Sequence, residues 1–221
     1  MIDKRVSINE SLAGVGDSST VMVGGWGDCG TPLRLITALA ATGVRDLTVI
    51  ITGSAPIEVL FEIGAVSRLV TSFAVYPGRA GVGSELERRV REGSITVELC
   101  SQGVLAERIR AGGAGIPAFY VEERMVGSFR STSETRVIDG ARCVLETALH
   151  ADLALVAASV ADPLGNLAWV NGERNFNDPM SYAADLVVVE AFDMYEVGWL
   201  PPEQVMVPGL VVDRVVPPSD T

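Results

Sequence analysis

Gln102 is the side chain of this sequence best suited to hold a polar ligand. Its amide can donate and accept hydrogen bonds at once, and with Gly103 it forms a predicted loop after a strand from Ile95 to Leu99. A short helix from Val104 to Arg110 is expected next. A glutamine in that place could bind a carboxylate or thioester oxygen. A lone glutamine can equally be solvated or cap a helix, so both interpretations stay open.

A run of small residues follows that predicted helix, at Gly112, Gly113, Ala114 and Gly115. Three glycines in so short a stretch favour an end to the helix, because glycine permits positive φ and weakens helices. They also leave backbone N–H groups uncovered, so another backbone or a ligand could approach closely. The alternative is a helix C-cap followed by a plain loop.

A second glycine-rich loop comes near the N-terminus, after a predicted strand from Thr20 to Val23. Its glycines are Gly24, Gly25, Gly27 and Gly30. Thr31 is a candidate N-cap and Pro32 fits the first turn of a helix over 33–42. The start of that helix could offer N–H groups to an anion. A simple strand-to-helix turn explains the loop as well, and its spacing is not that of a dinucleotide-binding fingerprint.

Composition excludes several classes of protein. The formal net charge of the 221 residues is −11, and no basic stripe appears, so we expect no nucleic-acid partner. A single histidine, His150, and three cysteines without metal-ligand spacing predict no metal site and a reduced, cytoplasmic protein. We expect no tightly bound cofactor, no secretory signal and no membrane-spanning segment.

Apolar strands alternate with helical patterns along the chain. Further strands are expected over 46–52, 67–74, 118–121, 136–138, 152–159, 167–170 and 186–189, and further helices over 56–63, 84–92, 141–149 and 179–184. Uniformly apolar strands between helices favour an α/β fold with an open, mostly parallel sheet covered on both faces, in one domain over 1–221. The helix ending at Leu149 would place His150 at its C-terminus, a position that suits a positive charge. Functional loops are expected at the carboxyl ends of the strands.

The segment from Gln102 to Tyr120 resembles the A subunit of family I coenzyme A transferases. That family carries Gln-Gly-x-Leu-Ala-Glu-Arg-Ile-Arg-Ala-Gly-Gly-Ala-Gly-Ile-Pro-Ala-Phe-Tyr, and only Val104 falls at its variable position. The first glycine loop is similar to the family signature Gly-Gly-Phe-x-x-x-Gly-x-Pro, with Trp26 in place of Phe. The Arg-Asn-Phe-Asn element at 174–177 also matches and is interpreted as mainly structural or interfacial, with ligand contact as the alternative. The resemblance covers about residues 5–216.

The resemblance implies the open α/β fold shared with sugar-phosphate isomerases. It also implies that CoA moves from an acyl-CoA to a carboxylic acid, such as a 3-oxoacid, acetate or a dicarboxylate. In the family the matching glutamine lines the acyl site, and the nucleophilic glutamate belongs to a Ser-Glu-Asn-Gly-type motif of the B subunit. This sequence has no such motif. We therefore expect no catalytic nucleophile in this chain, and a B-subunit partner in a heterodimer or an α2β2 heterotetramer.

Two departures from the family concern the substrate. Thr52 and Ser54 stand in a segment where the family commonly has Ser-Asn-Asn-Ala-Gly, so their hydroxyls could replace the asparagines or could simply form a turn. The segment 76–83 replaces a shorter loop. Two rival functions remain: part of a CoA-thioester ring-cleaving hydrolase, suggested by Gly-Gly-Trp-Gly at 24–27, and a non-catalytic small-molecule sensor.

Overall fold

The computed structural model describes residues 2–74, 84–127 and 134–218. The predicted substrate loop at 76–83 falls outside these residues. Among them, no helix has the length and apolar character needed to cross a membrane. The assignment of all 221 residues to one domain stays a prediction.

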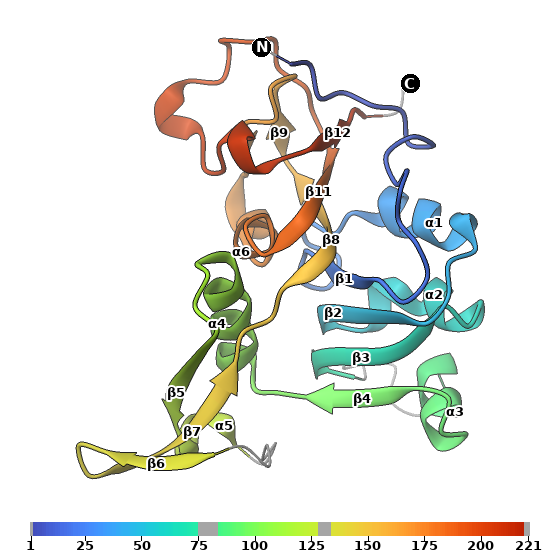
Figure 1. Ribbon diagram of the computed structural model, residues 1–221. Coiled ribbons are helices and arrows are strands. Elements are labelled where there is room, and N and C mark those ends of the chain that lie inside the picture. The colour runs from blue at the N-terminus through green and yellow to red at the C-terminus, as the bar shows by residue number, and fades with distance from the viewer. Residues whose placement is uncertain (1, 75–83, 128–133, 219–221) are drawn as a thin grey trace.

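A parallel sheet is the centre of the described structure (Figure 1). Its seven strands run in the order β12-β11-β8-β1-β2-β3-β4, and every pairing is parallel. The strands are β1 (Thr20–Val23), β2 (Leu47–Gly53), β3 (Val66–Phe73), β4 (Thr96–Leu99), β8 (Ala151–Ala158), β11 (Ala184–Ala191) and β12 (Arg214–Val216). The central strands are buried on both faces, as the uniformly apolar pattern predicted.

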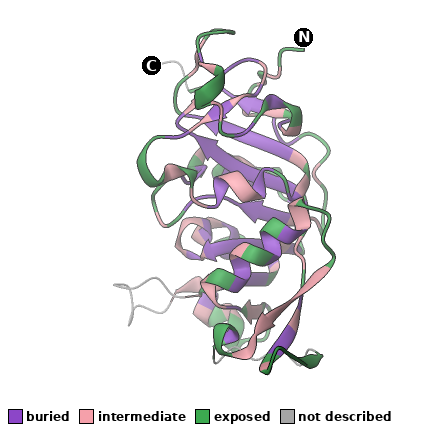
Figure 2. Ribbon diagram, turned by 90° about the vertical axis from the view of Figure 1, so that its left-hand side faces the viewer, coloured by how far each residue is buried: buried purple, intermediate pink, exposed green. Residues whose placement is uncertain are grey.

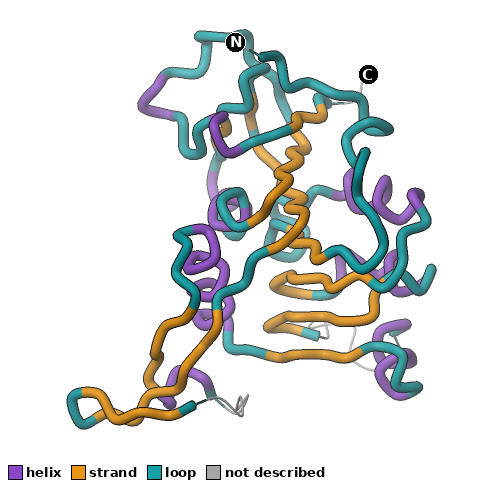
Figure 3. Tube along the Cα trace, viewed as in Figure 1, coloured by secondary structure: helices purple, strands orange, loops and turns teal. Residues whose placement is uncertain are grey.

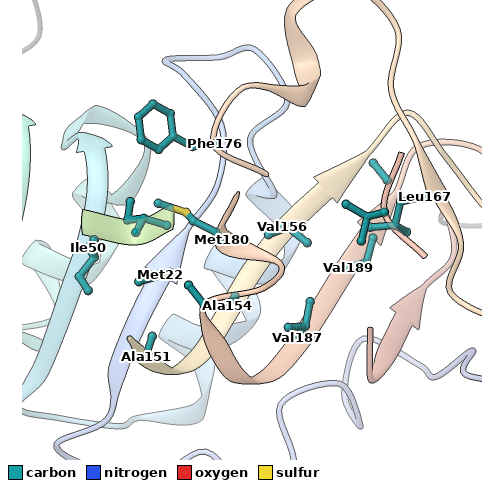
Figure 4. Close-up of a cluster of buried hydrophobic side chains, with 14 of the residues drawn as sticks. Met22, Ile50, Ala151, Ala154, Val156, Leu167, Phe176, Met180, Val187 and Val189 are labelled. Carbon is teal, nitrogen blue, oxygen red and sulfur yellow. The ribbon is translucent and has the colours of Figure 1, made fainter. Parts of the chain in front are cut away.

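Helices cover both faces of this sheet. One core cluster joins β1, β2 and β3 to α1 (Leu33–Thr42), α2 (Glu58–Glu62) and α3 (Glu85–Arg91). The other joins the opposite face to α4 (Gln102–Gly113) and α6 (Asn177–Met180). Figure 4 shows part of this second cluster, which includes Met180, Phe176, Met22 and Ile50. Figure 2 shows that the strands of the main sheet are largely buried.

A small antiparallel sheet extends from one end of the molecule, beyond α4 (Figure 3). It consists of β5 (Ala118–Glu122), β7 (Ala141–Thr147) and β6 (Thr135–Ile138), in the order β5-β7-β6. The remaining short elements are α5 (Glu123–Val126), β9 (Val160–Ala161), β10 (Leu167–Ala168) and the 3-10 turns over 55–57, 171–174, 202–204 and 209–211.

The sequence prediction was wrong for several elements. The segment 141–149 is not a helix, because Ala141–Thr147 forms β7, which pairs with both β5 and β6. His150 therefore follows a strand; its Nε2 lies 4.0 Å from Asp185 Oδ1. Thr31 does not cap α1, because its hydroxyl donates to the Gly27 carbonyl. The short helix predicted at 179–184 is α6, which lies earlier, at Asn177–Met180.

Candidate active site at the carboxyl edge of the main sheet

The carboxyl ends of β1 to β4 meet at one edge of the sheet, since these strands are parallel neighbours. The first glycine loop follows β1, Thr52 and Ser54 lie at the end of β2, and Gln102 follows β4. Loops at this edge of an open α/β sheet are the usual place for ligands. The structure therefore brings these predicted residues to one side of the molecule.

Gln102 is the first residue of α4, not part of a preceding loop. Its Nε2 and Oε1 atoms are both buried and have no hydrogen-bond partner. Ser101, at the N-cap position, does not cap the helix, because its hydroxyl donates to the Met125 carbonyl. Within the described residues, the backbone N–H groups of 102–104 donate no hydrogen bond outside the helix. An uncapped helix start and a buried unpaired amide thus occur together, and both can bind an oxygen of a ligand.

Gly103 leaves this helix start open to a ligand. A Cβ atom built on Gly103 would meet nothing within 4 Å. Since α4 has 12 residues, its other end lies roughly 17 Å from Gln102. The glycines at 112–115 lie at that other end, beside the start of β8. Gln102 and this glycine run, which the sequence prediction joined in one site, therefore lie at opposite ends of α4.

Gly112 and Gly113 are the last residues of α4, so the predicted helix end at Arg110 was too early. A Cβ on Gly112 would lie 1.9 Å from the Leu149 carbonyl oxygen, and one on Gly113 would lie 2.8 Å from Tyr182 Cβ. Gly115 has a φ of 69° and follows Ala114, the C-cap residue. The close approach predicted here is made by other segments of this chain.

The first glycine loop is packed against the segment 173–177. Asn177 is fully buried; its Nδ2 donates to the Gly30 and Glu173 carbonyls, each at 2.8 Å, and its Oδ1 accepts from Ala157 N at 2.9 Å. A Cβ on Gly24 would lie 2.0 Å from Asn177 Oδ1. These contacts agree with the structural interpretation of the Arg-Asn-Phe-Asn element.

The start of α1 does not provide the anion site that the sequence suggested. Glu190, buried on β11, accepts hydrogen bonds from Arg34 N at 2.9 Å and Leu35 N at 3.1 Å. Burial raises the pKa of this carboxyl group, although the two N–H groups and Arg34 act in the opposite direction. An internal carboxyl group therefore occupies the place that an anion would take.

Thr52 and Ser54 are both buried, and their hydroxyls donate to backbone carbonyls. Thr52 Oγ1 lies 3.3 Å from Gly25 O, and Ser54 Oγ lies 2.8 Å from Ala74 O. In this arrangement the donors support the loops around the site. Their role as substrate contacts stays a prediction.

Aromatic side chains border the same edge. The ring centroid of Trp26 lies 6.1 Å from that of Phe73 and 6.3 Å from that of Phe176. Trp26 and Phe73 keep 48% and 44% of their surface exposed. These rings place apolar, partly exposed surface at the carboxyl ends of β1 and β3, on the same edge of the sheet.

Cys100 and Glu107 are the potentially reactive side chains considered near the start of α4. Burial raises the pKa of the Cys100 thiol to about 11, so this group is a poor nucleophile at neutral pH. Glu107 is exposed and pairs with Arg110, as expected of a helix-surface residue. Among the described residues near the start of α4, neither Cys100 nor Glu107 is therefore set up as an activated nucleophile.

Comparison with known proteins gives the following similarities. The chain matches the family described as Coenzyme A transferase over residues 5–217. It is 40% identical to the A subunit of the 3-oxoadipate CoA-transferase of Pseudomonas putida, covering 98% of this chain and 94% of that protein. It is 36% identical to the alpha subunit of the acetate CoA-transferase of Escherichia coli, covering 98% and 97%.

Two solved structures share the fold. A variant of the decarboxylase AibA/AibB superposes with a TM-score of 0.84 at 26% identity, covering 99% of this chain and 84% of that one. Glutaconate coenzyme A-transferase from Acidaminococcus fermentans superposes with a TM-score of 0.83 at 21% identity, covering 97% and 75%.

Proposed function

This chain belongs to the coenzyme A transferase family, in which it corresponds to the A-type polypeptide, and from that premise we propose that its active site lies at the start of α4. The observation that carries the proposal is the buried, unpaired amide of Gln102 on an uncapped helix N-terminus. The ligand would be the carboxyl group of an acid or the carbonyl of its CoA thioester. The acid would be a 3-oxoacid, acetate or a dicarboxylate.

The reaction divides between two subunits. A glutamate of the B subunit would take CoA from the donor acyl-CoA as a glutamyl–CoA thioester, releasing the donor acid, and a second acid would then accept the CoA. Negative charge develops on the carbonyl oxygen during each acyl transfer. The N–H groups at 102–104 and the Gln102 amide would stabilise that charge, because they are already fixed where the oxygen would lie.

The partner subunit, the bound substrate and the cellular compartment follow from the same proposal. The partner would be a B subunit in a heterodimer or an α2β2 heterotetramer, because the relatives are named as A or alpha subunits. CoA thioester is a substrate, and no tightly bound cofactor is required. We place the enzyme in the cytoplasm, where acyl-CoA and the reduced thiols Cys29, Cys100 and Cys143 would be found together.

The test is reconstitution of the purified chain with its B subunit. The chain alone should transfer no CoA, and the complex should transfer CoA from an acyl-CoA to an added acid. In the complex, Gln102→Ala should lower kcat/KM by about 10- to 100-fold without lowering Tm, because the amide makes no internal hydrogen bond that would be lost.

Three outcomes would contradict this function. Transfer by the isolated chain would place a nucleophile within it. Hydrolysis of the thioester without an acceptor acid would indicate the ring-cleaving type of enzyme. Release of carbon dioxide with the thioester intact would indicate a decarboxylase, the activity named for a structural neighbour.

A further inference from the structure

Ser72 is the one other place in the described residues where a buried side-chain oxygen has no partner. The Ser72 Oγ and the two amide atoms of Gln102 are the only described side-chain nitrogen or oxygen atoms that are both buried and unpaired. A buried hydroxyl without a hydrogen bond costs roughly 1–3 kcal/mol of stability. The hydrogen-bond partner of the Ser72 hydroxyl is therefore expected to come from another molecule.

Ser72 and Gln102 lie at the same corner of the sheet. Ser72 is the penultimate residue of β3, two positions after Val70, which packs in the core cluster beneath α4. Side chains two apart on a strand share a face, so Ser72 faces α4. Thr71 pairs with Leu99 of the adjacent strand β4, and Gln102 begins α4 three residues after Leu99.

Neighbouring hydroxyls on the same edge differ from Ser72. Thr71 Oγ1 donates to Thr52 O at 3.0 Å, and the Thr52 and Ser54 hydroxyls donate to Gly25 O and Ala74 O. Each of these hydroxyls forms a hydrogen bond within this chain. Ser72 alone in this group retains an unused donor, on the face of the sheet that α4 covers.

We propose that Ser72 is a specificity-determining residue whose hydroxyl donates to the 3-oxo oxygen of an acid held at Gln102. This rests on the proposed function, because the acid must already bind at the start of α4. Ser72 and Gln102 come from different elements, so they provide two separate contacts, one for the reacting carboxyl group and one for a second oxygen.

The chemistry favours a neutral second oxygen. Ser72 and Gln102 carry no charge, and the buried guanidinium of Arg108 on the same helix is occupied by Glu98 at 2.5 Å and by the Thr147 carbonyl at 2.8 Å. A second carboxylate could not take Arg108 as its partner, and a carboxylate buried without a cation is costly. A ketone oxygen needs only one donated hydrogen bond, which the Ser72 hydroxyl supplies.

The test compares two acceptor acids, acetoacetate and butyrate, which differ in the 3-oxo oxygen. In the assembled complex, Ser72→Ala should lower kcat/KM for acetoacetate by about 10-fold and change that for butyrate by less than about 2-fold. Tm should stay the same or rise, because an unpaired buried hydroxyl has been removed. Ser72→Thr, which keeps a hydroxyl, should recover most of the acetoacetate activity.

Ser67→Ala is the matched control. Ser67 lies on the same strand, but its hydroxyl donates to Leu47 O at 3.3 Å, at the amino end of β3. This variant should leave the ratio of the two acids unchanged. An equal loss with both acids, or a fall in Tm with Ser72→Ala, would overturn the proposal.

Failure of the underlying function can be told apart. If the wild-type complex transfers CoA to neither acid, nor to acetate or a dicarboxylate, the proposed function is wrong. The hydrogen bond from Ser72 to the 3-oxo oxygen is then tested by binding. The measurement is the Tm increase that each acid produces in the wild type and in Ser72→Ala. A larger increase with acetoacetate that disappears in Ser72→Ala supports the contact, and equal increases refute it.

Discussion

At the scale of single residues, polar side chains divide into those that hold the loops and those that remain free. Asn177 is the clearest of the first kind, since its amide joins the glycine loop after β1 to β8 and to the segment before α6. Gln102 carries the same amide group but makes no internal bond. The contrast separates a structural amide from one available to a substrate.

Asn177→Ala should therefore destabilise the protein by about 3 kcal/mol. The change removes three hydrogen bonds and leaves their backbone partners buried and unsatisfied. Tm should fall by about 10 °C for a chain of this size. Asn9→Ala is the control, because Asn9 lies outside the core and its loss should cost less than about 0.5 kcal/mol. Equal effects of the two variants would show that the glycine loop does not depend on this amide.

Local sequence could predict some of these roles and not others. Asn177 lies in a recognisable motif, and its structural role was predicted. Ser72 was missed, because a serine near the end of an apolar strand gives no local sign that its hydroxyl will lack a partner. The cap of α1 was also beyond local prediction, since Glu190 is 156 positions from Arg34 along the chain.

At the scale of elements, α4 shows why a glycine pair did not end a helix. Gly112 and Gly113 extend α4 because the main chain at Leu149 and residue Tyr182 pack where side chains would otherwise stand. Intrinsic propensity predicted that the helix ends at Arg110, and tertiary packing overrode it. The opposite error occurred at 141–149, where helix-forming residues adopt a strand because β5 and β6 provide partners on both sides.

Two glycine-to-alanine changes in α4 should have opposite effects. Gly112→Ala should cost about 3 kcal/mol, because its Cβ would lie 1.9 Å from the Leu149 carbonyl oxygen and the helix would have to move. Gly103→Ala should stabilise by about 0.5 kcal/mol, because the position is helical and has open space. Urea unfolding of both variants measures the difference. A tolerated Gly112→Ala would show that the contact with Leu149 is not a close one.

At the scale of the whole molecule, a buried charged cluster joins the small sheet to the main sheet through α4. Arg108 contacts Glu98 of β4 and the Thr147 carbonyl of β7, while Glu146 Oε2 lies 3.8 Å from its Nε. Burial opposes ionisation of Glu98, but hydrogen bonds and charge from Arg108 and Arg68 lower its pKa overall. Burial raises the pKa of Glu146, and the attraction of Arg108 does not reverse this.

The raised pKa of Glu146 predicts how stability changes with pH. A carboxyl group whose pKa is higher in the folded state contributes most below its unfolded pKa of about 4.3, and this contribution is lost as pH rises through the folded pKa. Glu146→Gln keeps the shape and removes the charge. The variant should therefore match the wild type near pH 4 and become progressively more stable than it toward pH 7.

Paired urea titrations of the two proteins from pH 4 to pH 8 measure this difference, and groups common to both cancel. Glu62→Gln is the control for the loss of a carboxyl group at an exposed position. If Glu146→Gln instead lost stability relative to the wild type as pH rose, the attraction between Glu146 and Arg108 would outweigh the cost of burial. The charged cluster would then stabilise the contact between the two sheets. In that case Arg108→Met should make the backbone amides of the small sheet exchange their hydrogens faster.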